Sequence, residues 1–479
     1  MAPGELAIVL HTHMPYMEGG GDWPVELDAY LRSPTGFGTW PFGEELLFEA
    51  IASCYVPLLD VLDRAGPPAR VTLSLTPVLC DQLAHPGAID RCLRFLTELR
   101  PLTHRLDADE LRAVGEPALA DELERSAAEY ARAAQRLRQR QNEPGGLVGA
   151  LGRHVSWTSS ATHAILPLLA TDAGIALQLQ TGIESHRRRF GGWDGGLWLP
   201  ECGYAPGLDP ALERAGMRAA CVELTNAFGL GSERHLTPVR SPDGPVLWPI
   251  DRSVIALAWG RGGYPSRPPY RDYHAYTTHR HRVRRIDGGP YDHDAASRQA
   301  RADAAEFVAA VRERVRRGGV SVFAVDTELL GHWWYEGVQW LEAVLDEADR
   351  QGLALTTLDD ALARHQPVAA GELGVSSWGE GGDLRTWSGP NVAAFAWRTR
   401  AAELGLAATP AARVTDRSLR ELLALQSSDW AFLADRELAG DYPEQRAQLH
   451  ADALTKTLSE PAGIEPALRG LAPWLGGWS

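Results

Sequence analysis

Two carboxylates stand directly after apolar runs of the sequence, and both have aromatic neighbours. Glu201 follows Leu-Trp-Leu-Pro at 197–200, and Asp326 follows the apolar run 320–325 and precedes two adjacent tryptophans. Barrel folds carry their catalytic groups at the carboxyl ends of buried strands. Retaining cleavage of a glycosidic bond needs one ionised and one protonated carboxyl group about 5–5.5 Å apart. The two residues therefore indicate glycoside chemistry, although a surface position for Glu201 and a helix cap at Asp326 are the plain alternatives.

Histidines follow the same kind of apolar run. His11 and His13 are two residues apart after the run 6–10, and on extended backbone this spacing turns both rings to one side. Their spacing allows metal ligation, as in barrel-type zinc hydrolases, or direct hydrogen bonding to a sugar. His163 stands near a predicted helix start, where a capping role is as ordinary as a functional one. No convincing further set of histidine and aspartate ligands follows other strand candidates, so we expect no metal site.

Sixteen tryptophans are more than a core of this size needs. Several fall in polar loops: Trp23, Trp40, Trp259, Trp378 and Trp387. A single exposed indole is often only packing. As a group, indole faces on loops form platforms for the apolar faces of glucose rings.

The composition excludes several classes of function. A formal net charge of −15 argues against a nucleic-acid partner, because phosphate binding requires a basic face. The five cysteines are scattered without a Cys-x-x-Cys pair, so neither a disulfide framework nor a structural zinc site is expected. No leader-like start and no membrane-length apolar run is visible. We expect a cytoplasmic monomer without a cofactor and without membrane contact.

Strands and helices alternate along the first two-thirds of the chain, which predicts an α/β fold with a parallel sheet or barrel. The strand candidates are 6–10, 70–75, 154–157, 197–199, 219–222, 254–258, 320–325 and 354–357, and helical patterns cover 44–64, 162–173, 296–317 and 338–351. A longer helical stretch at 89–141 reads as an inserted pair of helices. We expect a unit at 1–370 with a helical insertion at 86–145, followed by a helical C-terminal domain at 371–479.

On these motifs the chain resembles glycoside hydrolase family 57, close to its α-1,4-glucan branching enzymes. The segments that carry the resemblance are 11–16, 161–169, 197–204, 263–271, 326–337, 376–382 and 426–433. They occur in family order and cover nearly the whole chain, so the set is specific although each segment alone is weak.

The resemblance implies an incomplete (β/α)7 barrel with a helical insertion and a helical C-terminal domain that lines the cleft. It implies a double displacement without metal on an α-glucan, with Glu201 as nucleophile and Asp326 as general acid/base. The implied substrate-binding residues are His11, His13, His163, Trp23, Trp259, Arg261, His332, Trp334, Trp378, Trp387 and Asp429.

One segment departs from the family pattern. The loop at 226–237 looks shorter than in branching enzymes and lacks the tyrosine thought to shield the glycosyl-enzyme from water. The residues before it, Val-Glu-Leu-Thr at 222–225, replace the usual Asp-Thr-His. Since transfer requires exclusion of water, an α-1,4-glucan hydrolase of the α-amylase type and a 4-α-glucanotransferase remain alternatives to branching. More distant alternatives are a metal-dependent hydrolase using His11 and His13 and a non-catalytic glucan-binding protein.

Overall fold

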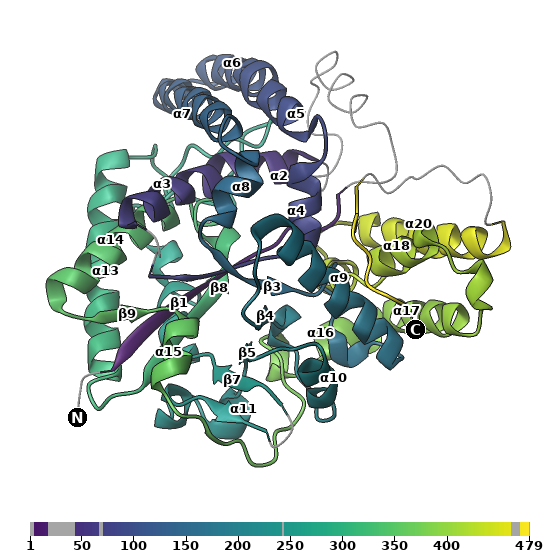
Figure 1. Cartoon of the computed structure of the whole chain (residues 1–479). Coiled ribbons are helices and arrows are strands. Elements are labelled where there is room, and N and C mark those ends of the chain that lie inside the picture. Colours follow the sequence, from purple (N-terminus) through teal and green to yellow (C-terminus); the bar gives the residue numbers. More distant parts are fainter. Residues whose placement is uncertain (1–3, 18–43, 67–69, 242–243, 461–469, 479) are drawn as a thin grey trace.

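The computed structural model describes residues 4–17, 44–66, 70–241, 244–460 and 470–478 (Figure 1). Its centre is a curled sheet whose strands run in the order β10-β6-β7-β5-β4-β3-β2-β1-β8, with β9 paired to β1. The paired strands of this sheet are parallel except β6 with β7. The strands are β1 (Glu5–Thr12), β2 (Thr72–Leu75), β3 (Val155–Ser159), β4 (Gly196–Trp198), β5 (Ala219–Val222), β6 (Val239–Arg240), β7 (Val246–Pro249), β8 (Val320–Asp326), β9 (Ala354–Thr356) and β10 (Val368–Ala369).

This sheet is an incomplete barrel, as predicted. β7 and β8 do not form a ladder, but the backbone N–H of Asp251, just after β7, donates to the carbonyl of Val322 at 2.9 Å. The buried Asp251 carboxylate accepts hydrogen bonds from Arg314 and Ser321, both at 2.9 Å, at this junction between β7 and β8. The contact holds the two ends of the curled sheet together, and the carboxyl ends of the strands therefore converge.

Helices cover the outside of the sheet and form two further groups. The helices around the sheet are α2 (Glu44–Ala50), α3 (Val56–Ala65), α4 (Pro77–Ala84), α9 (Asp172–Phe190), α10 (Asp209–Arg214), α11 (Thr225–Phe228), α12 (Arg252–Ala258), α13 (His293–Arg314), α14 (Gly337–Gln351) and α15 (Leu358–Arg364). A π-helical turn at Ile51–Tyr55 joins α2 to α3. None of the described helices combines the length and the apolarity needed to span a membrane.

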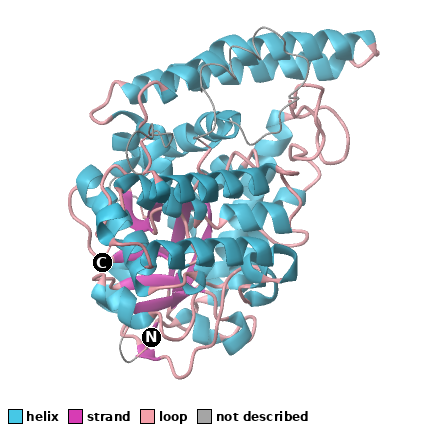
Figure 2. Cartoon of the chain, turned by 90° about the vertical axis from the view of Figure 1, so that its right-hand side faces the viewer, coloured by secondary structure: helices cyan, strands magenta, loops and turns pink. Residues whose placement is uncertain are grey.

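The first further group lies between β2 and β3 and consists of α5 (Ala88–Arg94), α6 (Arg100–Ala113), α7 (Pro117–Gln141) and α8 (Gly146–Gly152). The long helices α6 and α7 run across the top of the molecule, above the strands (Figure 2). The second group follows β10 and consists of α16 (Arg385–Ser388), α17 (Ala393–Ala407), α18 (Asp416–Leu425), α19 (Asp429–Asp435) and α20 (Tyr442–Ser459). α17, α18 and α20 stand to one side of the sheet (Figure 1). The helical nature of both regions is as predicted.

Two predicted elements are wrong. The run 254–258 is helix α12 rather than a strand, because its buried residues Val254, Ile255 and Ala258 share one helical face and the preceding strand β7 takes the place in the sheet. The segment 162–173 is mostly not helical. His163 has a positive φ of 60° and the following residues make only a short 3-10 turn at Leu166–Leu168, so helix α9 starts at Asp172, capped by Thr171.

Candidate active site

Glu201 lies in a tight turn directly after β4. Its backbone is left-handed, with φ 59° and ψ 21°, and Cys202 follows with φ 52°. Such a conformation is unfavourable for residues with a Cβ, by about 1–3 kcal/mol each, and is found where a site requires it. The turn is held by hydrogen bonds from Cys202 N–H to Leu199 O at 2.8 Å and from Trp378 N–H to Glu201 O at 2.9 Å. The strained turn thus aims the Glu201 carboxylate away from the strand.

Asp326 is the last residue of β8 and pairs in register with His11 on β1. A 3-10 turn at Thr327–Leu329 follows it and places Glu328 nearby. Asp326 and Glu201 line the same cavity, which has a volume of about 1370 Å³. The two carboxylates that the sequence analysis singled out are therefore brought to one site.

Burial, together with repulsion from a neighbouring carboxylate, raises the pKa of both carboxyl groups. The pKa of Glu201 is raised to about 8, first by burial and then by the charge of Asp326. The pKa of Asp326 is raised to about 7, by burial and by the charge of Glu328. Two carboxyls that repel each other in this way hold one proton between them around neutral pH.

The surroundings decide which of the two carries that proton. The Trp378 indole N–H donates to Glu201 Oε2 at 2.5 Å, which favours the ionised form of Glu201. Asp326 instead faces Glu328, whose Oε1 accepts from the Tyr55 hydroxyl at 2.6 Å and from the His13 backbone N–H at 3.1 Å. Burial raises the pKa of Glu328 to about 8, but these two donors favour its ionised form, and a charge on Glu328 favours a proton on Asp326. The raised pKa of Glu201 is slightly the higher, whereas the donor on Glu201 and the carboxylate beside Asp326 favour a proton on Asp326.

The three predicted histidines form one cluster beside Glu201. His11 Nε2 lies 2.9 Å from His163 Nε2, and His163 Nδ1 lies 2.9 Å from Ser428 Oγ and 3.7 Å from Glu201 Oε1. The rings of His13 and His163 are stacked with centroids 4.0 Å apart. Burial lowers the pKa of His11 and His163, so both are neutral near pH 7 and act as hydrogen-bonding groups.

The C-terminal helices complete this cluster through Asp429, the first residue of α19. Both of its carboxylate oxygens lie 3.1 Å from His13 Nε2. The pair with His13 keeps the pKa of Asp429 lowered in spite of its burial. Within the described parts of the chain, no three His, Cys, Asp or Glu side chains are arranged to hold a metal ion.

The remaining predicted binding residues fall into three groups. Trp259, His332, Trp334, Trp378 and Trp387 line the cavity, with Trp259 about half exposed and Trp334 and Trp387 buried. Arg261 is exposed and is not among the described residues that line the cavity. Trp23 lies outside the described residues.

Several side chains of the site were not predicted from the sequence. Glu328 is two residues beyond Asp326 in the same motif, so its position was a usable signal. Tyr55 is 273 residues away from its partner Glu328 and carries no local signal. Arg252 forms an ion pair with the buried Glu223 and also donates to the carbonyl of Trp378. Glu223 belongs to the altered strand end, and this pair now supports the tryptophan that bonds to Glu201.

The loop at 226–237 does not line the cavity, although Asn226 at its start donates to the carbonyl of Gly381, next to the cavity-lining Glu380, at 2.8 Å. It contains part of α11 and a 3-10 turn at Glu233–Leu236, and Arg314 donates to the carbonyls of Gly231 and Ser232 at 2.8 and 2.6 Å. All of its residues are described, and none of them lines the cavity. In this structure the loop is thus fastened to α13 rather than placed over Glu201.

Comparison with known proteins gives matches along the whole chain. The model of glycosyl hydrolase family 57 matches residues 156–373, and the model of the 1,4-alpha-glucan branching enzyme C-terminal region matches residues 396–465. A probable 1,4-alpha-glucan branching enzyme of Mycobacterium tuberculosis is 32% identical over 531 positions, which cover 100% of this chain and 95% of that protein. The 1,4-alpha-glucan branching enzyme of Thermococcus kodakarensis is 29% identical over 516 positions, covering 94% and 72%.

A solved structure matches the fold over its whole extent. The GH57-type branching enzyme from Pyrococcus horikoshii superposes with a TM-score of 0.82 at 28% identity, covering 98% of this chain and 94% of that one. The sheet and both helical groups therefore have counterparts in a solved structure.

Proposed function

Because the chain belongs to glycosyl hydrolase family 57, we propose that it is a retaining 1,4-α-glucan branching enzyme, which cleaves α-1,4 bonds and forms α-1,6 bonds. The observation that carries the proposal is the contrast between its two carboxyls in one cavity. Glu201 has a hydrogen-bond donor on its carboxylate, and Asp326 has a carboxylate beside it. This contrast divides the roles of nucleophile and acid between them.

In the first step, a Glu201 carboxylate oxygen attacks the anomeric carbon of a glucose unit in the donor chain. The bond from that carbon to the glycosidic oxygen breaks, and Asp326 gives its proton to this oxygen. The shortened chain leaves as an alcohol, and the transferred segment stays bound to Glu201 as a glycosyl ester. The hydrogen bond from the Trp378 indole N–H to Glu201 weakens as the carboxylate loses its negative charge.

In the second step, the 6-hydroxyl of an acceptor chain attacks the same carbon. Asp326, now ionised, takes the proton of this hydroxyl, and the ester bond to Glu201 breaks. An α-1,6 bond has formed, and both carboxyls are back in their starting states. Retention of configuration follows from the two successive inversions.

The histidine cluster forms the wall of the cavity beside the glucose unit that reacts. His163 lies beside Glu201, and His13 is fixed by Asp429 and Thr76, so the two stacked rings form a rigid surface at the level of the nucleophile. Both ring nitrogens of each histidine already have protein partners, so the cluster contributes shape and fixed position rather than free hydrogen-bonding groups. The C-terminal helices thus contribute to binding through Asp429 and Ser428.

Incubation of the purified protein with amylose tests the proposal. Iodine colour, reducing ends and α-1,6 signals in proton NMR are followed together. Branching predicts new α-1,6 signals with few new reducing ends. The Glu201→Gln variant should keep its fold by circular dichroism and lose at least about 1,000-fold in rate. A variant as active as the wild type would contradict the role of Glu201.

One observation favours a second candidate, an α-1,4-glucan hydrolase on the same scaffold. The loop at 226–237 lines no part of the described cavity and carries no tyrosine. The loop then takes no part in excluding water from the glycosyl ester, which transfer requires. New reducing ends without α-1,6 signals in the same experiment would identify hydrolysis, and new chain lengths without either would identify disproportionation.

The proposed partner is an α-glucan such as amylose or glycogen. A cytoplasmic location and a monomeric state stay predictions, which fractionation and light scattering would test.

A further inference from the structure

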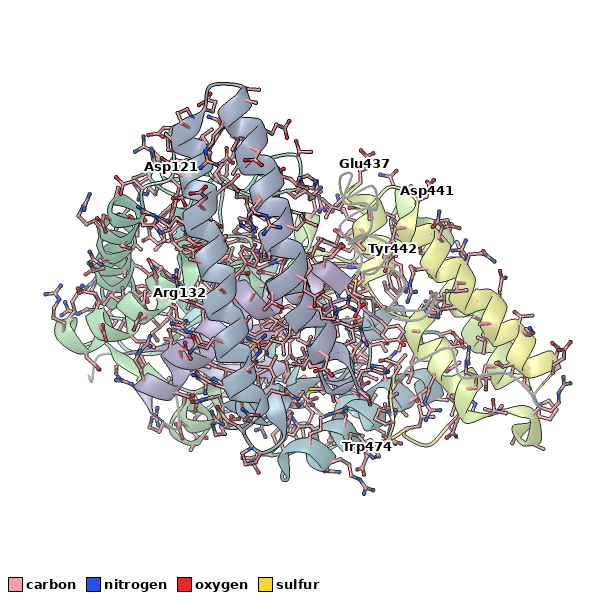
Figure 3. The ribbon with its side chains drawn as sticks, turned by 90° about the horizontal axis from the view of Figure 1, so that it is seen from above. Asp121, Arg132, Glu437, Asp441, Tyr442 and Trp474 are labelled. Carbon is pink, nitrogen blue, oxygen red and sulfur yellow. The ribbon has the colours of Figure 1, made fainter. Side chains whose placement is uncertain are left out.

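The cavity around the two carboxyls is larger than a pocket for a single small ligand. Pockets for small ligands measure about 300–1,000 Å³, and this one has about 1370 Å³. One end is lined by Arg436 and Leu438 behind α19, and the other by Arg132 and Arg136 of α7 in the insertion. Figure 3 shows Arg132 on the insertion and Glu437, the neighbour of Leu438, at the edge of the C-terminal helices, with α6 and α7 between the two labels. The cavity thus reaches from the C-terminal helices to the insertion.

The loop that follows Asp326, 327–336, is fastened to the second of these ends. Its Glu336 accepts from the Arg271 backbone N–H at 3.0 Å, and the Arg271 side chain pairs with Glu122 of α7 at 3.2 Å. Arg282 donates to the His332 carbonyl at 2.9 Å. Arg64 of α3 also pairs with Glu342 of α14 at 2.5 Å at this end. Glu201, by contrast, is covered by Trp378 from the C-terminal region.

In a double displacement, the two ends of the cavity bind different parts of the substrates. The leaving chain departs on the side of the acid that protonates it, and the acceptor must approach the same carbon from the same side. The donor segment that stays on the enzyme occupies the side of the histidine cluster and Trp378. The acceptor is therefore expected beyond Asp326, toward the insertion.

Aromatic side chains line this direction. The rings of Trp259 and Trp333 stack with centroids 6.5 Å apart and an angle of 25°, and 53% of Trp259 is exposed. Farther along, Tyr273 and Tyr276 form an edge-to-face pair with centroids 6.1 Å apart. Arg282 lies over the Tyr273 ring at 4.8 Å, which fixes this pair to the loop of His332. Two aromatic pairs along one path suit successive rings of a neutral sugar chain.

A polar group without a protein partner lies at the start of this path. His332 is 3% exposed and lines the cavity, and neither of its ring nitrogens has a hydrogen-bond partner within the described structure. A buried imidazole without partners is unfavourable, because its nitrogens have lost their hydrogen bonds to water. A sugar hydroxyl beside Asp326 would supply the missing partner.

We propose that this part of the cavity, the acceptor arm defined by Trp259, His332, Trp333, Tyr273 and Tyr276, binds the acceptor α-glucan. The proposal rests on the proposed function, because only a transferase needs a second chain. Trp333 carries the acceptor glucose nearest to Asp326, and Tyr273 and Tyr276 carry glucose units farther along the chain.

A donor with a very small leaving group separates the acceptor from the leaving chain. Maltotriosyl fluoride loads Glu201 with release of fluoride, and maltotetraose is added as the acceptor. Fluoride release counts all glycosyl-enzyme formed, and mass spectrometry divides the products between transfer and hydrolysis. Trp333→Ala and Tyr276→Ala should raise the KM for maltotetraose at least about tenfold and lower the ratio of transfer to hydrolysis at least about fivefold. Trp397→Ala is the matched control, since Trp397 is 71% exposed on α17 and lies outside the cavity lining.

The outcomes distinguish the two proposals. If wild type releases fluoride no faster than Glu201→Gln, the proposed function fails. If wild type transfers but both variants keep its KM for maltotetraose and its transfer ratio, the acceptor arm is wrong and the function stands. Tyr276 is 38% exposed, so its variant stays informative even if Trp333→Ala does not fold.

Discussion

At the scale of single residues, the reaction depends on a small number of contacts that keep two similar acids in different states. Glu201 and Asp326 are both buried and repel each other. Neither burial nor repulsion can therefore make one of them the nucleophile and the other the acid. The division comes from Trp378 on one side and Glu328 on the other. Each of these two contacts can be removed with little change in shape, and each should move a different limb of the pH profile.

Replacement of Trp378 by Phe removes the donor to Glu201 Oε2 and keeps an aromatic ring in place. The ionised form of Glu201 loses a hydrogen bond, so its pKa rises further. Because the reaction needs ionised Glu201, the acid limb of kcat/KM should move to higher pH by about one unit. The Trp387→Phe control should leave this limb in place, since the Trp387 indole nitrogen has no protein partner in the described structure. An unmoved limb in Trp378→Phe would show that the hydrogen bond does not set the state of Glu201.

Replacement of Glu328 by Gln removes the negative charge beside Asp326. The pKa of Asp326 should then fall from its raised value of about 7, because its ionised form is no longer repelled. Since Asp326 must be protonated to act as an acid, the alkaline limb of kcat/KM should move to lower pH. Tyr55→Phe removes a donor that favours the charge on Glu328, so it should move the same limb in the same direction but less. A shift to higher pH in either variant would contradict this arrangement.

At the scale of elements, Glu403 on α17 ties the C-terminal helices to the segment that leads into α9. It is fully buried and accepts from the backbone N–H groups of Ala170 and Thr171 at 3.0 and 2.7 Å, from the Thr171 hydroxyl at 2.6 Å and from Gln426 at 3.1 Å. These hydrogen bonds of Glu403 fix the end of the segment that runs from His163 to the start of α9.

Glu403→Gln should therefore destabilise the protein, although the glutamine side chain has nearly the same size and shape as glutamate. An amide has one acceptor oxygen instead of two and faces N–H donors with its own NH2 group, so the free energy of unfolding should fall by about 1–3 kcal/mol. Thermal melting measures this loss. The control is Glu444→Gln, which changes an exposed pair with Arg398 and should alter the melting temperature little. Equal melting of the two variants would show that the four bonds add no stability.

The helices and strands also show how much of the fold could be predicted from the sequence alone. Alternation of apolar runs and helical patterns predicted β1 to β5, β8 and β9, because buried parallel strands are short, apolar and β-branched. It missed β7 at Val246–Pro249 and read α12 as a strand, since a short apolar run fits either structure until its partners are known.

The candidate site could be predicted where chemistry and motif coincide. Glu201, Asp326 and the histidines follow strands directly, so their convergence was expected from the sheet alone. Their individual roles stay predictions. The contacts of Tyr55 with Glu328 and of Arg252 with Glu223 depend on side chains brought together only by folding, and no periodicity reveals them.

At the scale of the whole molecule, the site belongs to no single region. The barrel supplies both carboxyls and the histidines, and the C-terminal helices supply Asp429 and Ser428 to hold them. The insertion lines the other end of the cavity. Since carboxyls with raised pKa values lie in the middle of this assembly, the stability of the whole fold is linked to their protonation.

The sign of this linkage follows from the raised pKa of Asp326. A carboxyl with a higher pKa in the folded state binds its proton more tightly there, so the folded state loses stability as pH rises from about 4 through about 7. A rise in pKa of this size corresponds to about 4 kcal/mol. Asp326→Asn removes the ionisation, so its melting temperature should exceed that of wild type by a few degrees at pH 8 and by much less at pH 5.

Asp349→Asn is the matched control, because Asp349 is an exposed aspartate whose pKa is lowered by its bonds to Arg70. Both pH 5 and pH 8 lie above its folded and unfolded pKa values, so its effect on melting should be the same at the two pH values. Differential scanning calorimetry of the three proteins at both pH values gives the comparison. If Asp326→Asn also shows no difference between pH 5 and pH 8, Asp326 is not protonated more readily in the folded state. The assignment of the acid proton to Asp326 would then lose its basis.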